Sequence, residues 1–242
     1  MNKSKLLTKV ILVVFSISAL NTTSSFALGK EVNVLALGDS ITAGMDENNK
    51  WVGNYYSALN DLLTKKNIKW SFLGDYSRDQ KTQYQADGGF CLASIKYKCN
   101  TSPKNPNSIT QLYLQFHKNH KEKLNYVFIQ GGINDLSSRR NAPNSVPEPI
   151  VSLRALIKQV KKDNPGVKII LLNLTKPVLS TEEVAFNKNI SKLGKEYSQV
   201  YIIDTTSVKE KSLFIDGLHP NAAGYKALGL TLFNALHKLK FI

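Results

Sequence analysis

VNVLALGDS, residues 32–40, is an apolar run that ends in a glycine, an aspartate and a serine. A near-continuous apolar run of this length is typical of a strand that is buried on both faces of a parallel sheet. Such a strand would place Ser40 just beyond its carboxyl end, where open α/β sheets hold their reactive groups. The stretch therefore predicts an α/β fold and locates a candidate nucleophile within it.

Strand-like and helix-like patterns alternate along the rest of the chain. Further buried strands are predicted at residues 68–73, 126–130, 167–174 and 200–203. Helices are predicted at residues 51–66, 108–122, 149–162, 181–197 and 221–238, with start signals at Ser108, at Ser180 or Thr181, and at Asn221. The alternation predicts a three-layer α/β/α domain with a five-stranded parallel sheet. The irregular stretch at residues 74–107 is longer than compact connections need, which is typical of functional loops.

The first 27 residues have the pattern of a secretory signal peptide. Three lysines come first, then an apolar stretch at residues 10–20, and then Ser25-Phe26-Ala27 as a small-x-small cleavage site. The apolar stretch is short for a membrane span, and no second stretch of spanning length follows it. We therefore expect export to the periplasm or the medium, with residues 28–242 forming one domain that is monomeric and has no stable membrane span. An uncleaved membrane anchor is the alternative.

Charge and cysteine content narrow the choice of partners. The formal net charge is +14 at pH 7, but the lysines are spread along the polar faces and ends of the predicted helices. No basic stripe with interleaved aromatic residues is present, so nucleic-acid binding is not expected.

Cys91 and Cys99 lie eight positions apart, and an exported chain meets an oxidising environment that favours a disulfide between them. Metal binding is the weaker alternative, because two cysteines without a nearby histidine do not make a zinc site.

Three short segments carry the residue types of an acyl-transfer site. They are Gly38-Asp39-Ser40-Ile41-Thr42, Gly131-Gly132-Ile133-Asn134-Asp135 and Asp216-Gly217-Leu218-His219-Pro220-Asn221. Together they supply a nucleophile, an amide donor, and a base with the carboxylate that orients it. Each segment alone is also a common turn sequence. All three follow predicted strands or precede a predicted helix, so they can converge on one edge of the sheet.

These segments, in this order, resemble the SGNH or GDSL-type esterase and lipase superfamily. The resemblance spans nearly all of the chain after the signal. It implies that Ser40 is the nucleophile, His219 the general base and Asp216 its partner. It also implies an oxyanion hole made by Ser40, Asn134 and a glycine of Asp87-Gly88-Gly89-Phe90, with Gly89 as the donor and Gly88 as the alternative.

The sequence also indicates what the site does not use. The nucleophile-elbow pattern Gly-x-Ser-x-Gly does not surround Ser40, which favours a flavodoxin-like sheet over the α/β-hydrolase fold. No phosphate-binding Gly-x-x-x-x-Gly-Lys and no His-Glu-x-x-His motif occur, so no cofactor and no metal are expected. Asp39 is expected to support its loop through hydrogen bonds. Three histidines are expected at the surface: His117, His120 and His237.

Within the superfamily, residues 38–44, 51–55 and 71–74 look most like carbohydrate esterases that remove acetyl groups from xylan-type polysaccharides. Four aromatic residues are candidates for stacking on sugar rings, Trp51, Tyr84, Phe90 and Tyr97, whereas Tyr55 is expected in the core. The expected function is that of an exported serine esterase acting on small acyl groups of carbohydrate. The alternatives are a lysophospholipase or thioesterase acting on longer chains, and a non-catalytic envelope protein that binds anionic polymers.

Overall fold

The computed structural model describes residues 31–46, 48, 50–92, 108–141 and 147–242. The predicted signal segment at residues 1–27 lies outside these ranges, as do Tyr97 and Cys99. Export and the disulfide to Cys91 therefore stay predictions. Among the described residues, no helix is long and apolar enough to cross a membrane.

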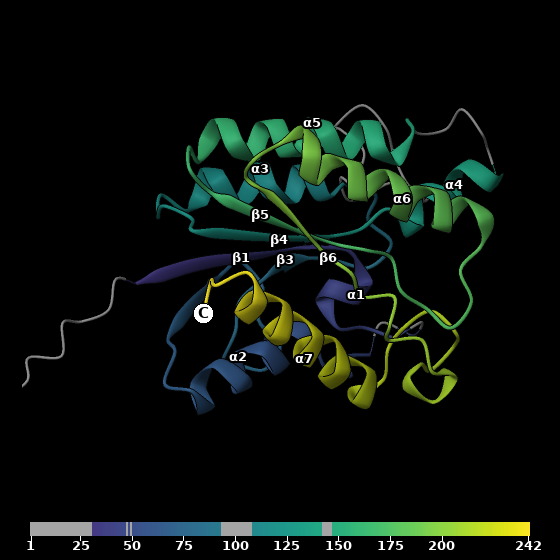
Figure 1. The fold of residues 1–242 in the computed structure, drawn as a ribbon, viewed down its shortest axis with the longest axis horizontal. Coiled ribbons are helices and arrows are strands. Elements are labelled where there is room, and N and C mark those ends of the chain that lie inside the picture. The colour runs from purple at the N-terminus through teal and green to yellow at the C-terminus, as the bar shows by residue number, and fades with distance from the viewer. Residues whose placement is uncertain (1–30, 47, 49, 93–107, 142–146) are drawn as a thin grey trace, which may run out of the picture. The chain divides into compact units, whose positions relative to one another are not determined.

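A parallel sheet forms the centre of the unit from Glu31 to Ile242 (Figure 1). Its main strands are β1 (Val32–Gly38), β2 (Trp70–Leu73), β4 (Tyr126–Gln130), β5 (Lys168–Leu172) and β6 (Val200–Ile203). They lie in the order β2-β1-β4-β5-β6, and the two-residue strand β3 (Gln85–Ala86) pairs with the carboxyl end of β1. This is the predicted flavodoxin-like order, with its switch point between β1 and β4.

Helices cover both faces of the sheet (Figure 1). One face carries α3 (Ile109–Asn119), α5 (Pro149–Asp163) and α6 (Thr181–Glu196), and the other carries α2 (Tyr55–Lys65) and α7 (Ala222–Lys238). Alternate strand residues enter two separate cores: Leu35 and Val127 face the first helix group, whereas Val34 and Phe128 face the second. Because both faces are covered, the strands are apolar at nearly every position.

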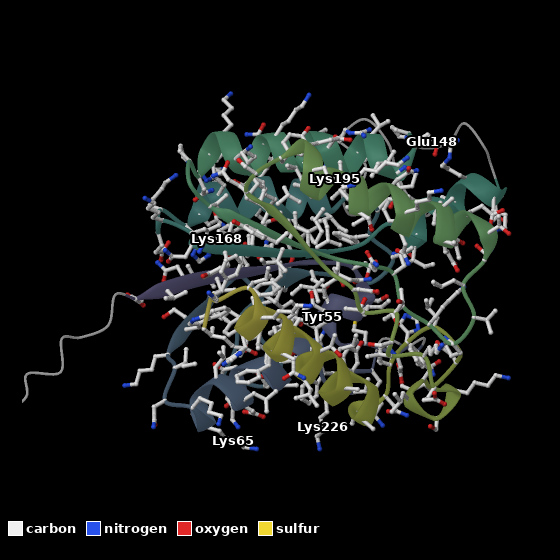
Figure 2. The ribbon with its side chains drawn as sticks, viewed as in Figure 1. Tyr55, Lys65, Glu148, Lys168, Lys195 and Lys226 are labelled. Atoms are coloured by element: carbon white, nitrogen blue, oxygen red, sulfur yellow. The ribbon has the colours of Figure 1, made fainter. Side chains whose placement is uncertain are left out.

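The helix boundaries follow local capping chemistry. Ser180 and Glu183 form a capping box at the start of α6, and the Asn221 side chain accepts from two N–H groups of α7. Ser108 is the N-cap residue of α3, although its side chain makes no cap hydrogen bond there. Figure 2 shows Lys65 and Lys226 pointing outward from α2 and α7, and Lys195 of α6 is exposed as well, as the charge pattern predicts.

Two short helices had no clear signal in the sequence. α1 (Ser40–Ala43) follows β1 directly, and α4 (Ile133–Asn141) follows β4 after Gly131 and Gly132. A third short element, the 3-10 helix η1 (Lys211–Leu213), precedes the loop that carries Asp216 and His219. These elements bring the three predicted segments to the carboxyl edge of the sheet.

Candidate active site

Ser40 begins α1 at a sharp exit from β1. The turn requires Gly38, because a Cβ there would lie 2.1 Å from Thr42 Oγ1 and 2.4 Å from the Gln130 carbonyl oxygen. Asp39 is the N-cap of α1, and its carboxylate accepts from the N–H of Ile41 at 3.0 Å. Ser40 is therefore held by a rigid backbone and is only 8% exposed.

His219 lies against the Ser40 hydroxyl. Its Nε2 is 3.0 Å from Ser40 Oγ, across 179 positions of sequence, and its Nδ1 is 2.6 Å from Asp216 Oδ2. The other carboxylate oxygen of Asp216 accepts from the N–H groups of Leu218 and His219, at 2.8 and 2.7 Å. Asp216 thus fixes both the loop backbone and the ring.

The environment of Asp216 keeps it ionised. Partial burial raises the pKa of this carboxyl, but hydrogen bonds from the His219 ring and from the N–H groups of His219 and Leu218 outweigh the burial. The net effect is a pKa of Asp216 below its ordinary value. A carboxylate next to Nδ1 holds the proton on that nitrogen, which leaves Nε2 able to accept one from Ser40.

The predicted oxyanion donors lie on three different elements. The N–H of Ser40 is in the first turn of α1, and Gly89 has a φ of 74° in the segment after β3. The N–H of Gly88 already donates to Asp87 Oδ1 at 2.7 Å, whereas the Gly89 N–H has no acceptor within the described part of the chain. The geometry therefore favours Gly89 over Gly88 as the backbone donor.

Asn134 and Asp135, in the first turn of α4, hold the glycine segment in place. Asn134 Nδ2 donates to the Phe90 carbonyl oxygen at 2.9 Å, and Asp135 Oδ2 accepts from the Leu92 N–H at 2.9 Å. Asp135 is completely buried. The two side chains couple the amide of Asn134 to the position of Gly89.

This constellation can be compared with known proteins. Residues 36–227 match the family model of the GDSL-like lipase/acylhydrolase family. The chain belongs to this family. Its members are hydrolases of acyl bonds, so the protein is a serine ester hydrolase of the SGNH or GDSL type. A search of curated protein sequences found no match.

Solved structures share the GDSL-like fold. A family 3 carbohydrate esterase from Talaromyces cellulolyticus has a TM-score of 0.64 and 20% identity, and the match covers 87% of this chain and 99% of that one. A family 3 carbohydrate esterase from Clostridium thermocellum has a TM-score of 0.63 and 19% identity, covering 87% and 97%. An acetyl xylan esterase has a TM-score of 0.60 and 17% identity, covering 85% and 100%.

Next to the GDSL-like site lies a network of buried polar side chains that the sequence did not predict. Thr42 Oγ1 lies 2.9 Å from Tyr55 Oη and 3.3 Å from Gln130 Oε1, and all three residues are buried. They join α1, which begins at Ser40, to α2 and to the end of β4. Only the fold brings them together, so no local sequence signal could have revealed the network.

Asp39 has the structural role that the sequence predicts, with one unusual property. It is fully buried, and its Oδ2 has no hydrogen-bond partner among the described residues. Burial raises the pKa of Asp39 to about 7, against the lowering effect of the Ile41 N–H, and the nearby charge of Asp135 adds to the rise. A buried acid next to the nucleophile thus titrates near neutral pH.

Two of the four residues predicted to stack on sugar rings lie in the core. Tyr84 is 1% exposed and Phe90 is 6% exposed, and both lie in the hydrophobic core, so neither lines a cleft. They are buried because Tyr84 packs on Tyr56 and because Phe90 faces the first helix group. Tyr55 is in the core as expected, Trp51 is 36% exposed, and Tyr97 lies outside the described residues.

Three histidines outside the candidate site were predicted to lie at the surface. His237 is exposed, as predicted, and His120 is half-buried with its Nε2 2.9 Å from Asp75 Oδ1. His117 is half-exposed and stacks on Tyr113. Within the described ranges, no group of three or more histidine, cysteine, aspartate or glutamate side chains is placed to hold a metal.

Proposed function

We propose that the protein is an exported serine esterase that removes small acyl groups, acetyl above all, from carbohydrate. The observation that carries the proposal is the continuous hydrogen-bonded path from Ser40 Oγ to His219 and on to Asp216, with steps of 3.0 and 2.6 Å. A serine hydroxyl is inert by itself, and a path of this kind supplies the base and the oriented ring that its activation requires.

The reaction follows from this arrangement. Ser40 Oγ attacks the ester carbonyl carbon while His219 Nε2 takes the hydroxyl proton. The tetrahedral intermediate collapses when His219 returns this proton to the leaving alcohol, and the acyl group stays on Ser40. Water, deprotonated by His219, then attacks the acyl-enzyme. In the second collapse His219 returns this proton to Ser40 Oγ, and the carboxylic acid is released. Asp216 stabilises the imidazolium form in both halves of the reaction.

Three donors serve the negative oxygen of each intermediate. They are the N–H groups of Ser40 and Gly89 and the side-chain amide of Asn134. An amide nitrogen carries two N–H bonds, so Asn134 can serve both the oxyanion and the Phe90 carbonyl. Donors that are already aimed at the developing charge contribute about 3 kcal/mol each to lowering the barrier.

The choice of substrate and compartment has separate support. The solved structures with this fold include carbohydrate esterases and an acetyl xylan esterase, which favours acetyl esters of carbohydrate. The signal pattern of residues 1–27 favours export, and a polysaccharide substrate outside the cytoplasm is consistent with it.

The test is the hydrolysis of a generic acetyl ester by the purified protein, side by side with Ser40→Ala. We expect hydrolysis by the wild type and a loss of at least about 10³-fold in the variant. Equal rates would leave only the non-catalytic binding function. A panel of acetylated sugars, acetylated xylan and lysophospholipids then identifies the substrate class, and faster cleavage of the lipids would favour the lysophospholipase alternative.

A further inference from the structure

A groove with a volume of about 470 Å³ lies at the surface where helices α2 and α7 meet. Side chains of these two helices and of the segment 51–54 line it. Ser40, Gly89, Asn134, Asp216 and His219 are all absent from the lining, so the groove is separate from the candidate active site. Its volume is within the range of about 300–1,000 Å³ that is usual for small-molecule sites.

Trp51 gives the groove an exposed aromatic surface. The side chain is 36% exposed, whereas the other tryptophan, Trp70, is 9% exposed and packs in the core. The backbone around Trp51 is held firmly, because Trp51 pairs with Met45 in an antiparallel bridge and the Val52 N–H donates to the Gly44 carbonyl oxygen at 2.9 Å. The indole is thus a flat apolar surface, on a fixed backbone, that a ligand can cover.

The rest of the lining combines aliphatic and charged side chains. Leu62 and Leu230 contribute aliphatic surface, and Asp61, Lys65 and Lys226 contribute charge. A sugar ring has the same two characters, since its C–H faces are apolar and its edge carries hydroxyl groups. An alkyl chain would cover the apolar surface but would take water from the charged groups without replacing it, which costs free energy.

The charge of the groove favours an anionic ligand. Figure 2 shows Lys65 and Lys226 pointing outward from α2 and α7, and both side chains are exposed. Within the described ranges, neither lysine lies within ion-pair distance of a carboxylate, although Asp61 belongs to the same lining. Two cations and one carboxylate leave the groove with a net positive charge, which attracts an anion.

We infer that this groove is a second, non-catalytic site that binds an acidic sugar unit of a polysaccharide. A C–H face of the sugar ring packs on Trp51, and the sugar carboxylate lies near Lys65 and Lys226. The choice of carbohydrate as ligand rests on the proposed function. A polymer held in the groove stays at a high effective concentration for the candidate active site of the same molecule.

The experiment measures the dissociation constants of two polymers by affinity electrophoresis. One polymer is xylan that carries glucuronic acid units, the other is unsubstituted xylan, and both are free of acetyl groups, so binding is measured without turnover. The variants of the groove are Trp51→Ala, Trp51→Phe and Lys226→Gln. Lys195→Gln is the matched control, because Lys195 is an exposed lysine of α6 outside the lining. Thermal unfolding of each protein checks that it is folded.

We expect the wild type to bind the acidic xylan more tightly than the unsubstituted xylan. Trp51→Ala should weaken binding of the acidic xylan by at least about tenfold, and Trp51→Phe, which keeps a ring, by less. Lys226→Gln should weaken it by about two- to fivefold. Lys195→Gln should bind as the wild type does, which separates the groove from the general positive charge of the chain.

Three results would overturn the inference: a wild type that binds neither polymer, a folded Trp51→Ala with wild-type affinity, or equal losses in Lys226→Gln and Lys195→Gln. Hydrolysis of a small acetyl ester by the same wild-type preparation tests the proposed function separately. Hydrolysis without polymer binding would overturn the inference and leave the esterase function in place. Polymer binding that depends on Trp51, without any hydrolysis, would support the second site and contradict the esterase function.

Discussion

On the proposed mechanism, His219 accepts the proton of Ser40, and Asp216 holds the ring in the tautomer that can do so. Asp216→Asn should lower kcat by about 10²- to 10⁴-fold, since an amide at this position favours the wrong ring tautomer. Steady-state kinetics on an acetyl ester measures kcat, and a wild-type kcat in Asp216→Asn would contradict the role of Asp216 in orienting His219.

On the proposed mechanism, Asn134 serves the transition state rather than the binding of the ground state. Asn134→Ala should lower kcat by about 10²- to 10³-fold and leave KM nearly unchanged, because the removed donor serves the oxyanion. Steady-state kinetics on one acetyl ester measures both constants. A rise in KM with kcat unaffected would place Asn134 in substrate binding instead.

At the scale of elements, helix α1 carries a buried acid as its cap. The pKa of Asp39 is raised by burial from 3.8 to about 7, so its contribution to stability is complete below pH 3.8 and is lost as the pH rises toward 7. Asp39→Asn keeps an oxygen for the Ile41 N–H and removes the charge. Relative to the wild type, the variant should gain up to about 4 kcal/mol of unfolding free energy between pH 4 and pH 8.

Urea unfolding of both proteins at several pH values measures that gain. Comparison with the wild type cancels the titration of other groups. A difference in unfolding free energy that is the same at pH 4 and pH 8 would mean that Asp39 does not titrate in this range.

The first turn of α4 holds the glycine segment through Asp135. Asp135→Ala should lower the unfolding free energy by about 1–3 kcal/mol, because the buried Leu92 N–H loses its acceptor. It should also lower kcat, since Gly89 is then less well positioned. Asp135→Asn restores an acceptor oxygen and should recover part of both. Denaturant unfolding and acetyl-ester kinetics on the two variants provide the measurement, and equal loss in both would argue against the positioning role.

At the scale of the whole molecule, the sequence predicted what depends on local pattern and missed what depends on distant contacts. β4 and β6 lie at the predicted residues, because each is a short apolar run flanked by polar residues. β3 was not predicted, since two residues form no pattern, and α4, with the sequence INDLSSRRN, has too few apolar residues to predict a helix.

The candidate site, too, was predictable where it depends on local motifs and not where it depends on distant contacts. The types of Ser40, His219 and Asp216 are visible in motifs, whereas the Thr42, Tyr55 and Gln130 network joins positions up to 88 residues apart. Tyr84 could not be placed from sequence, because an aromatic residue in a long loop can lie in a cleft or in the core. In the structure the Tyr84 ring packs on Tyr56 of α2, which places Tyr84 in the core.

Export is a property of the whole chain. If residues 1–27 are a signal peptide, the protein recovered from the periplasm or the medium should begin at Leu28. Intact-mass spectrometry of the recovered protein shows where it begins. Recovery from the membrane fraction with residues 1–27 still attached would support the uncleaved anchor instead.

The central claim is that His219 activates Ser40 as a nucleophile, and covalent labelling tests it most directly. A fluorophosphonate phosphonylates activated serines, with loss of fluoride, and peptide mass spectrometry locates the adduct. We expect one adduct, on Ser40, formed in step with the loss of acetyl-ester hydrolysis, and strongly slowed labelling in His219→Ala. Unchanged hydrolysis in a protein fully labelled at Ser40, or labelling of Ser40 at the wild-type rate in His219→Ala, would contradict the account.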